Sequence, residues 1–352
     1  MIVVLAMVGA LWGLGAILGM PRAARGYMIG LLYVAVLIIQ VMLPAGHPLR
    51  EATGESPALW LMIGAFAVIA ALYGKVLKRL KGRAEEKEIS ETVPVQRGAS
   101  FSPTELERYA RHIVLREIGG PGQKALRDAK VLVIGAGGLG APALQYLAAA
   151  GVGTIGVIDD DVVENANLQR QVIHTDDRIG MPKVFSAQAA MEAQNPYVEV
   201  RPYHRRLTED IADELFGAYD LILDGTDNFD TRYLTNRCAV AAAKPLISGA
   251  LSQWEGQVSV FDPASGTPCY QCVFPEAPAD GLAPSCAEAG VIGPLPGVVG
   301  SMMAVEAIKV LTGAGQALKG EMLIYDALWG ETRKIAIKSR DDCPVCGSVS
   351  EA

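Results

Sequence analysis

The segment KVLVIGAGGLG, residues 130–140, joins a run rich in β-branched residues to a glycine-rich turn, and an apolar stretch follows at 141–150. This order predicts a strand, a tight turn and a helix. Glycines in such a turn let backbone N–H groups approach a phosphate at the positive end of the helix dipole. A second strand is predicted at 154–158, followed by Asp159, where an acidic side chain can bind ribose hydroxyls. The predicted fold class is therefore α/β, a doubly wound, Rossmann-like sheet.

The glycine turn alone is equally compatible with an NAD enzyme and with another adenine-nucleotide enzyme. Three later segments favour the second class, because hydride transfer needs none of them: NANLQRQ at 165–171, GMPK at 180–183 and LILDGTDN at 221–228. Arg170 and Lys183 are cations that can stabilise charge on a triphosphate. Asp227, after a third predicted strand, is a hard oxygen ligand suited to Mg²⁺. Each could form an ordinary surface salt bridge, but together at one sheet edge they indicate a site.

Six cysteines in 352 residues are too few for a disulfide scaffold. Four of them form two Cys-x-x-Cys pairs, namely Cys269, Cys272, Cys343 and Cys346. Four thiolates suit a tetrahedral zinc, and a closed set of ligands leaves no position for water, so the predicted zinc is structural. A redox pair or two small disulfides are the alternatives, and both fit a reducing cytoplasm poorly.

The glycine turn, Asp159, NLQRQ, the lysine of GMPK and the TDN at 226–228 have the order and spacing of the MoeB/ThiF/HesA family, relatives of the ubiquitin-activating enzymes. The resemblance covers about residues 107–347 and is greatest to MoeB, the molybdopterin-synthase adenylyltransferase. It implies a ThiF/MoeB-type sheet and an adenylyltransferase. In such an enzyme ATP reacts with the C-terminal glycine of a small ubiquitin-fold sulfur carrier, giving an acyl-adenylate and pyrophosphate.

The resemblance also implies roles for individual residues. Catalysis would depend on Arg170, Lys183, Asp227 and Arg111, the last in a segment similar to the helix that offers an arginine to the other subunit of a homodimer. Asp227 would bind Mg²⁺. The implied nucleotide-binding residues are Gly138, Asp159, Ala166, Asn167, Leu168, Gln169, Arg170, Lys183, Asp227 and Asn228.

Cys286 lies in a segment rich in proline and glycine, residues 275–297. In some relatives a cysteine near this place is linked covalently to the carrier protein. An activated thiolate requires a nearby base or cation, and the sequence has none beside Cys286. We therefore expect no obligatory covalent role.

A MoaD-like carrier of molybdenum-cofactor synthesis, ending in Gly-Gly, is the first expected partner, and a ThiS-like carrier of thiamine synthesis is the second. The sulfur would come from a separate donor protein. Alternatives are a non-catalytic nucleotide-binding membrane scaffold, an NAD oxidoreductase, and an enzyme that adenylates a small molecule or a tRNA base. A net charge of −7 argues against a nucleic-acid partner, because binding would require a basic excess to neutralise phosphates.

Residues 1–74 contain only five charged side chains, and three uncharged runs lie at 2–20, 27–43 and 58–74. Runs of this length can cross a bilayer as helices, and the third helix is predicted to continue to residue 77. A cleaved signal peptide at the first run, or a buried hairpin in a soluble protein, is the alternative. The first run lacks the basic residues that begin a signal peptide.

Basic residues crowd the chain just after the third run, at Lys75, Lys78 and Arg79. The positive-inside rule then predicts an external N-terminus and a cytoplasmic catalytic domain. The sequence thus predicts a multi-pass protein of the inner (cytoplasmic) membrane. Its predicted parts are a membrane region at 1–78, a polar linker at 79–101 and an adenylyltransferase domain at 102–352.

Overall fold

The computed structural model describes residues 2–54, 56–66, 68, 69, 72–75, 100–278 and 289–347. The chain divides into two compact units, Met1–Pro94 and Val95–Ala352. Most of the predicted linker and Cys286 lie outside the described residues.

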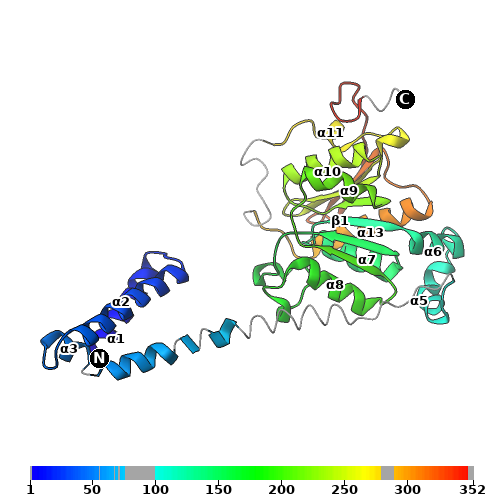
Figure 1. Ribbon diagram of the computed structural model, residues 1–352. Coiled ribbons are helices and arrows are strands. Elements are labelled where there is room, and N and C mark those ends of the chain that lie inside the picture. Colours follow the sequence, from blue (N-terminus) through cyan, green and yellow to red (C-terminus); the bar gives the residue numbers. More distant parts are fainter. Residues whose placement is uncertain are drawn as a thin grey trace. The chain divides into compact units, whose positions relative to one another are not determined.

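The first unit consists of helices (Figure 1). It contains α1 (Ile2–Ile17), α2 (Arg22–Met42) and the short α3 (Pro48–Thr53), and the described residues between 57 and 75 are also helical. Sequence analysis did not predict α3. It begins where His47 Nδ1 accepts a hydrogen bond from the backbone N–H of Leu49 at 3.2 Å, with a proline at the first helical position.

Two described helices are long and apolar enough to cross a membrane. One is Ala24–Met42 within α2, which contains most of the predicted run at 27–43. The other is α13 (Pro294–Thr312) of the second unit, 44% of which is buried within the protein. Length and apolarity therefore select a core helix as readily as a membrane helix. Three membrane-spanning helices remain a prediction from the sequence.

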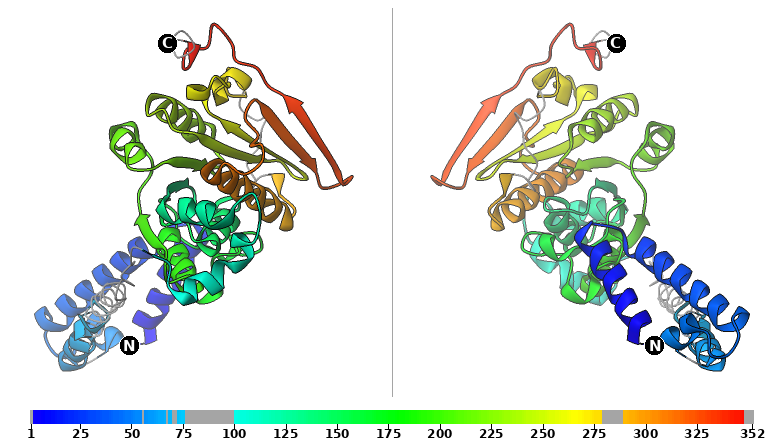
Figure 2. Two further views of the ribbon diagram at one scale, coloured as in Figure 1. Left: turned by 90° about the vertical axis from the view of Figure 1, so that its right-hand side faces the viewer. Right: turned by 90° about the vertical axis from the view of Figure 1, so that its left-hand side faces the viewer.

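The second unit is built on an eight-stranded sheet with the order β3-β2-β1-β4-β5-β6-β7-β8. Strands β1 to β5 are parallel, and β6 to β8 are antiparallel. Their bounds are β1 Lys130–Ile134, β2 Thr154–Ile158, β3 Glu199–Tyr203, β4 Leu221–Asp224, β5 Leu246–Leu251, β6 Glu255–Phe261, β7 Glu321–Asp326 and β8 Glu331–Ala336. The doubly wound sheet and the bounds of its first two strands are confirmed. The antiparallel extension, whose β7–β8 hairpin forms one edge (Figure 2), was not predicted.

Helices cover both faces of the sheet (Figure 1). The bounds are α5 Pro103–Ile113, α6 Gly119–Asp128, α7 Gly140–Ala150, α8 Lys183–Gln194, α9 Glu209–Gly217, α10 Phe229–Ala241 and α11 Tyr270–Val273. Alternate residues of each strand point to opposite faces, so Val131 and Val133 pack with α7, α8 and α13, whereas Leu132 and Ile134 pack with α9 and α10. Helix α5 begins after Ser102, because Ser102 and Glu105 form a reciprocal capping box.

The strand order reverses between β1 and β4, which opens a crevice at the carboxyl ends of the parallel strands. The glycine turn after β1 borders this crevice, and two of its positions require glycine. Gly135 has a positive φ of 91°, and a Cβ at Gly140 would lie 1.9 Å from the carbonyl oxygen of Gly135. The turn therefore leads directly into α7, whose N-terminus has no side-chain cap from Leu139.

Candidate active site

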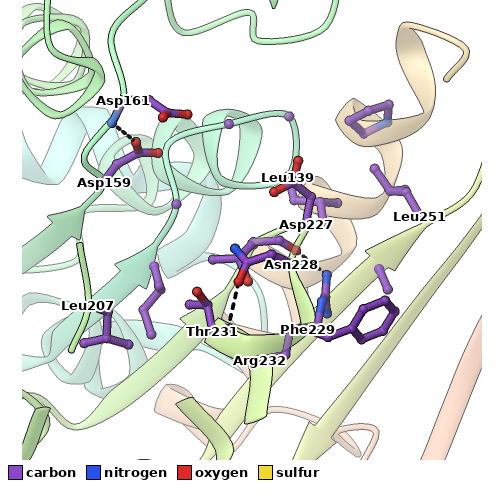
Figure 3. A pocket seen from close by; sticks show the side chains of 18 of the residues that line it. Leu139, Asp159, Asp161, Leu207, Asp227, Asn228, Phe229, Thr231, Arg232 and Leu251 are labelled. Carbon is purple, nitrogen blue, oxygen red and sulfur yellow. Dashed lines mark hydrogen bonds between the residues drawn. The ribbon is translucent and has the colours of Figure 1, made fainter. Parts of the chain in front are cut away.

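A pocket of about 680 Å³ lies at the carboxyl ends of β1, β2 and β4 (Figure 3). Asp159 and Asp161 lie at one end, and Asp227 and Asn228 lie nearer to Leu139 at the start of α7. Among the residues predicted to bind nucleotide or act in catalysis, those that line the pocket are Gly138, Asp159, Arg170, Lys183, Asp227 and Asn228. The structure thus brings the chemically distinctive members of the predicted set together.

The Asp159 carboxylate is held by two backbone donors. Its Oδ2 accepts a hydrogen bond from Ala136 N at 2.8 Å, and its Oδ1 accepts one from Asp161 N at 2.8 Å. Burial raises the pKa of Asp159, and the positive charge of Lys183 acts in the opposite direction. Each carboxylate oxygen can accept more than one hydrogen bond, so the side chain retains acceptor capacity for hydroxyl groups of a ligand.

Both predicted cations line the pocket. Lys183 is the first residue of α8; its side chain is only 5% exposed, and its Nζ lies 2.7 Å from Asp161 Oδ2. The guanidinium of Arg170 donates to Asn167 Oδ1 at 2.9 Å. Its Cδ lies 3.9 Å from the point that a Cβ would occupy at Gly138. These contacts pre-orient two positive charges at the pocket, where they need not be reorganised when a phosphate enters.

The loop that carries Asp227 is fixed by a buried polar network. Asp224 Oδ1 accepts hydrogen bonds from Thr226 N at 3.0 Å and from Thr226 Oγ1 at 2.7 Å. Arg232 donates to the carbonyl oxygen of Thr226 and, at 3.1 Å, to Ser248 Oγ. Its guanidinium also lies 3.7 Å from Asp224 Oδ2. The residue before Asp227 is therefore held by both its N–H and its carbonyl group, while the Asp227 side chain itself is exposed.

The side chain of Asn228, next to Asp227 in the sequence, has a structural role. Its side-chain oxygen accepts a hydrogen bond from Thr231 N at 2.9 Å and caps the N-terminus of α10. The cap fixes the direction in which the chain leaves the loop. Asp227 is consequently the carboxylate of this loop that remains available for a cation.

Five residues of the predicted set do not line the pocket within the described part of the chain. Four of them directly precede Arg170 in the sequence, and the fifth is on α5; they are Ala166, Asn167, Leu168, Gln169 and Arg111. Asn167 accepts a hydrogen bond from Arg170, which does line the pocket. Arg111 is exposed on α5. Their predicted roles remain predictions.

Sequence analysis missed several polar residues that line the pocket, including Gln171, Arg205, Arg206 and Arg232. Gln171 follows Arg170 directly and could have been found as part of the same motif. No local pattern marks Arg205 and Arg206, which lie in the loop after β3. Only the sheet order brings that loop to the pocket.

The four predicted zinc ligands form one buried cluster. The Sγ–Sγ distances are 3.3 Å for Cys272–Cys346, 3.6 Å for Cys269–Cys343 and 3.9 Å for Cys269–Cys272. Tetrahedral zinc with bonds of about 2.3 Å requires sulfur atoms about 3.8 Å apart, so the thiols fit this ion. Asn236 Nδ2 lies 3.6 Å from Cys269 Sγ and Arg340 N lies 3.5 Å from Cys272 Sγ, which are contacts that stabilise thiolates.

The fold and this pocket define an α/β nucleotide-binding protein with a separate cysteine cluster. The chain belongs to the ThiF family, whose model matches residues 109–345. It is 51% identical over 251 residues to the sulfur carrier protein adenylyltransferase of Thermus thermophilus, covering 70% of this chain and 93% of that protein. It is 48% identical over 248 residues to the SAMP-activating enzyme E1 of Haloferax volcanii, with coverage of 70% and 91%. The predicted family and the adenylyltransferase class of the enzyme are confirmed.

Solved structures agree with the fold. A crystal structure of E. coli MccB with ATP matches with a TM-score of 0.57 and 22% identity, covering 64% of this chain and 69% of that one. The SeMet PaaA structure matches with a TM-score of 0.59 and 23% identity, covering 78% and 89%. At this level of identity the likeness concerns the architecture of the chain.

Proposed function

We propose that this protein uses ATP to adenylate the C-terminal glycine of a ubiquitin-fold sulfur carrier protein. The observation that carries the proposal is the convergence of Arg170, Lys183 and Asp227 on one pocket beside the glycine turn. The printed names of the Thermus and Haloferax relatives, a sulfur carrier protein adenylyltransferase and a SAMP-activating enzyme, support this substrate class.

The reaction forms one bond and breaks one. A carboxylate oxygen of the carrier attacks the α-phosphorus of ATP, the bond from that phosphorus to the bridging oxygen breaks, and pyrophosphate leaves with the electron pair. Arg170 and Lys183 oppose the negative charge that develops on the phosphate oxygens, and removing one such group typically costs about 10²–10³ in rate. Asp159 orients the nucleotide through its ribose. Asp227 would hold Mg²⁺, which when bound neutralises phosphate charge.

A MoaD-like carrier of molybdenum-cofactor synthesis is the proposed partner, and a ThiS-like carrier of thiamine synthesis is the alternative. The acyl-adenylate would accept sulfur from a separate donor protein. ATP–pyrophosphate exchange with each purified carrier distinguishes the two. Exchange should require a free C-terminal Gly-Gly, and a carrier truncated by one glycine should be inactive.

Variants test the site assignment in the same assay. Arg170→Ala and Asp227→Ala should each reduce exchange at least tenfold, because the first removes a cation that faces the reacting phosphates and the second removes the proposed Mg²⁺ ligand. Arg237→Ala and Asp230→Ala are matched controls, since both residues are exposed on α10 and neither lines the pocket. Full exchange in both site variants would refute the assignment.

We also propose a homodimer in which Arg111 serves the ATP site of the other subunit. An apolar groove of about 740 Å³ between α7 and α13, lined in part by Tyr146, Val298 and Val305, supports a second copy as its occupant. Arg111→Ala and Asp227→Ala chains should each be inactive alone. After unfolding and joint refolding, random pairing should restore about a quarter of the parent activity, because half the dimers contain one intact site. If activity does not recover, the proposal of a site shared between two subunits is contradicted.

The apolar first unit supports the proposal that the chain is anchored in the cytoplasmic membrane. Large side chains such as Leu5, Leu31 and Ile38 are more than half exposed on α1 and α2, and such surfaces require an apolar environment. We propose three spanning helices at 2–20, 27–43 and 58–77, a linker at 79–101 and a catalytic domain at 102–352 in the cytoplasm. The zinc bound by the four cysteines is proposed to be structural.

A further inference from the structure

His174 makes two hydrogen bonds in the interior of the second unit, directly behind the glycine turn. Its Nε2 lies 2.9 Å from the carbonyl oxygen of Ala136, and its Nδ1 lies 2.9 Å from Ser186 Oγ. The residue is 5% exposed. None of these three residues lines the pocket formed by the described residues. His174 is therefore placed to act on the site through other residues and not on a ligand.

The two bonds close a ring that joins the glycine turn, the end of β2 and the start of α8. Ala136 N donates to Asp159, Asp161 N donates to the same carboxylate, and Lys183 Nζ pairs with Asp161. Ser186 lies one turn after Lys183 on α8. His174 closes the ring through its hydrogen bonds with Ser186 and with the carbonyl group of Ala136. The ring includes two residues assigned above to nucleotide binding, Asp159 and Lys183.

The chemistry of the partners fixes the protonation of His174. A carbonyl oxygen can only accept a hydrogen bond, so Nε2 must carry the proton. In the neutral imidazole Nδ1 then accepts from the hydroxyl of Ser186. Ala136 is consequently held at both its groups: its N–H by Asp159 and its carbonyl by His174.

We propose that His174 is a positioning residue for ATP, which keeps the glycine turn in its phosphate-binding conformation and ties that turn to the helix bearing Lys183. The inference rests on the proposed ATP-dependent function. Losing one hydrogen bond to a buried carbonyl commonly costs about 1–3 kcal/mol, which corresponds to roughly 5- to 150-fold in binding. The loss should appear in ATP affinity, since the turn meets the nucleotide before any bond is broken.

His174 is mainly neutral at neutral pH. Burial lowers the pKa of His174 below its ordinary 6.5, the hydrogen bond to Ala136 opposes this, and the nearby Lys183 and Arg178 lower it further. The neutral ring already supplies the donor to Ala136. ATP affinity should therefore not depend on the titration of His174 above about pH 6.5.

Two substitutions separate the two hydrogen bonds. In His174→Gln the side-chain amide reaches the position of Nε2 and can still donate to Ala136. In His174→Asn the amide reaches only the position of Nδ1, toward Ser186. The test measures the Kd of a non-hydrolysable ATP analogue by calorimetry on the full-length protein in detergent. It also measures kcat and KM for ATP by pyrophosphate exchange.

His174→Gln should bind the analogue within about threefold of the parent. His174→Asn should raise Kd and KM at least about fivefold, with kcat changed less than threefold. Asn195→Ala is the matched control, because Asn195 is fully buried at the other end of α8 and donates to the carbonyl of Ala148 at 2.6 Å. It should lower the melting temperature without changing Kd.

An unchanged Kd in His174→Asn would overturn the positioning role. So would equal losses of affinity in His174→Asn and Asn195→Ala at equal losses of melting temperature, because the effect would then be general destabilisation. If the parent protein itself fails to bind the analogue, the proposed function fails and this inference fails with it. If the parent protein binds the analogue and His174→Asn binds it equally well, only the inference is refuted.

Discussion

Replacing Arg232 with methionine should destabilise the catalytic unit and misplace Asp227. Asp224 is 1% exposed, and the substitution removes its buried cation while roughly preserving volume. Breaking a buried pair from one side costs about 3–5 kcal/mol. The lower end applies here, because Asp224 keeps its hydrogen bonds from Thr226 and Ser248. A unit of this size loses about 2–4 °C per kcal/mol, so the melting temperature should fall by about 6–12 °C.

The expected loss of exchange activity has a separate cause. Arg232→Met also leaves the carbonyl of Thr226 without its donor, next to Asp227. Displacement of a catalytic group by about 1 Å can cost 10²-fold, so exchange should fall at least tenfold. The double variant Asp224→Asn/Arg232→Met removes the orphaned charge and should recover more than half of the lost melting temperature, but not the exchange activity.

The assays are thermal unfolding by circular dichroism and ATP–pyrophosphate exchange, both on the full-length protein in the same detergent. Arg237→Met, an exposed arginine on the same helix, should change neither. A double variant no more stable than Arg232→Met would refute the argument from an uncompensated buried charge. Normal exchange in Arg232→Met would refute the link to Asp227.

Cys343→Ala should lower the zinc content, measured by elemental analysis, and reduce the melting temperature more than the intrinsic exchange rate, because binding energy in a closed site is also folding energy; parent protein without zinc would contradict this. A reporter enzyme fused after residue 84 should be active only as a cytoplasmic reporter, and one inserted at Gly54 only as an external reporter; the reverse pattern would mean that the number of spans differs by one. The exchange activity of Cys286→Ala should lie within about threefold of the parent activity, since adenylation needs no protein nucleophile. A stoichiometric carrier adduct at Cys286 during turnover, together with loss of thiocarboxylated product in the variant, would reverse this expectation.

Contiguous patterns made part of this structure predictable. A β-branched run, a glycine turn and an apolar helix occupy one stretch of sequence, so β1 and its phosphate-facing turn follow from local rules. The capping box at Ser102 is equally local. The two cysteine pairs are distant in sequence, but the chemistry of four thiolates is specific enough to indicate that they converge.

The polar networks behind the pocket have no such signature. His174 contacts Ala136 across 38 positions, and Arg232 contacts Ser248 across 16. Each contact depends on how strands and helices pack, and neither residue differs in the sequence from an ordinary surface cation or imidazole. The edge strand β8 was missed because it is exposed along its whole length and lacks an alternating apolar pattern.

The cysteine cluster joins residues that are 74 positions apart. A ribosome makes about 5–20 residues per second, so the first pair is synthesised roughly 4–15 seconds before its partners. The segments that become α13, β7 and β8 are synthesised in that interval. The four-sulfur site can therefore close only after β8 has been translated, and a metal bound to all four thiolates would distinguish chains that contain Cys343 and Cys346 from those interrupted before Cys343.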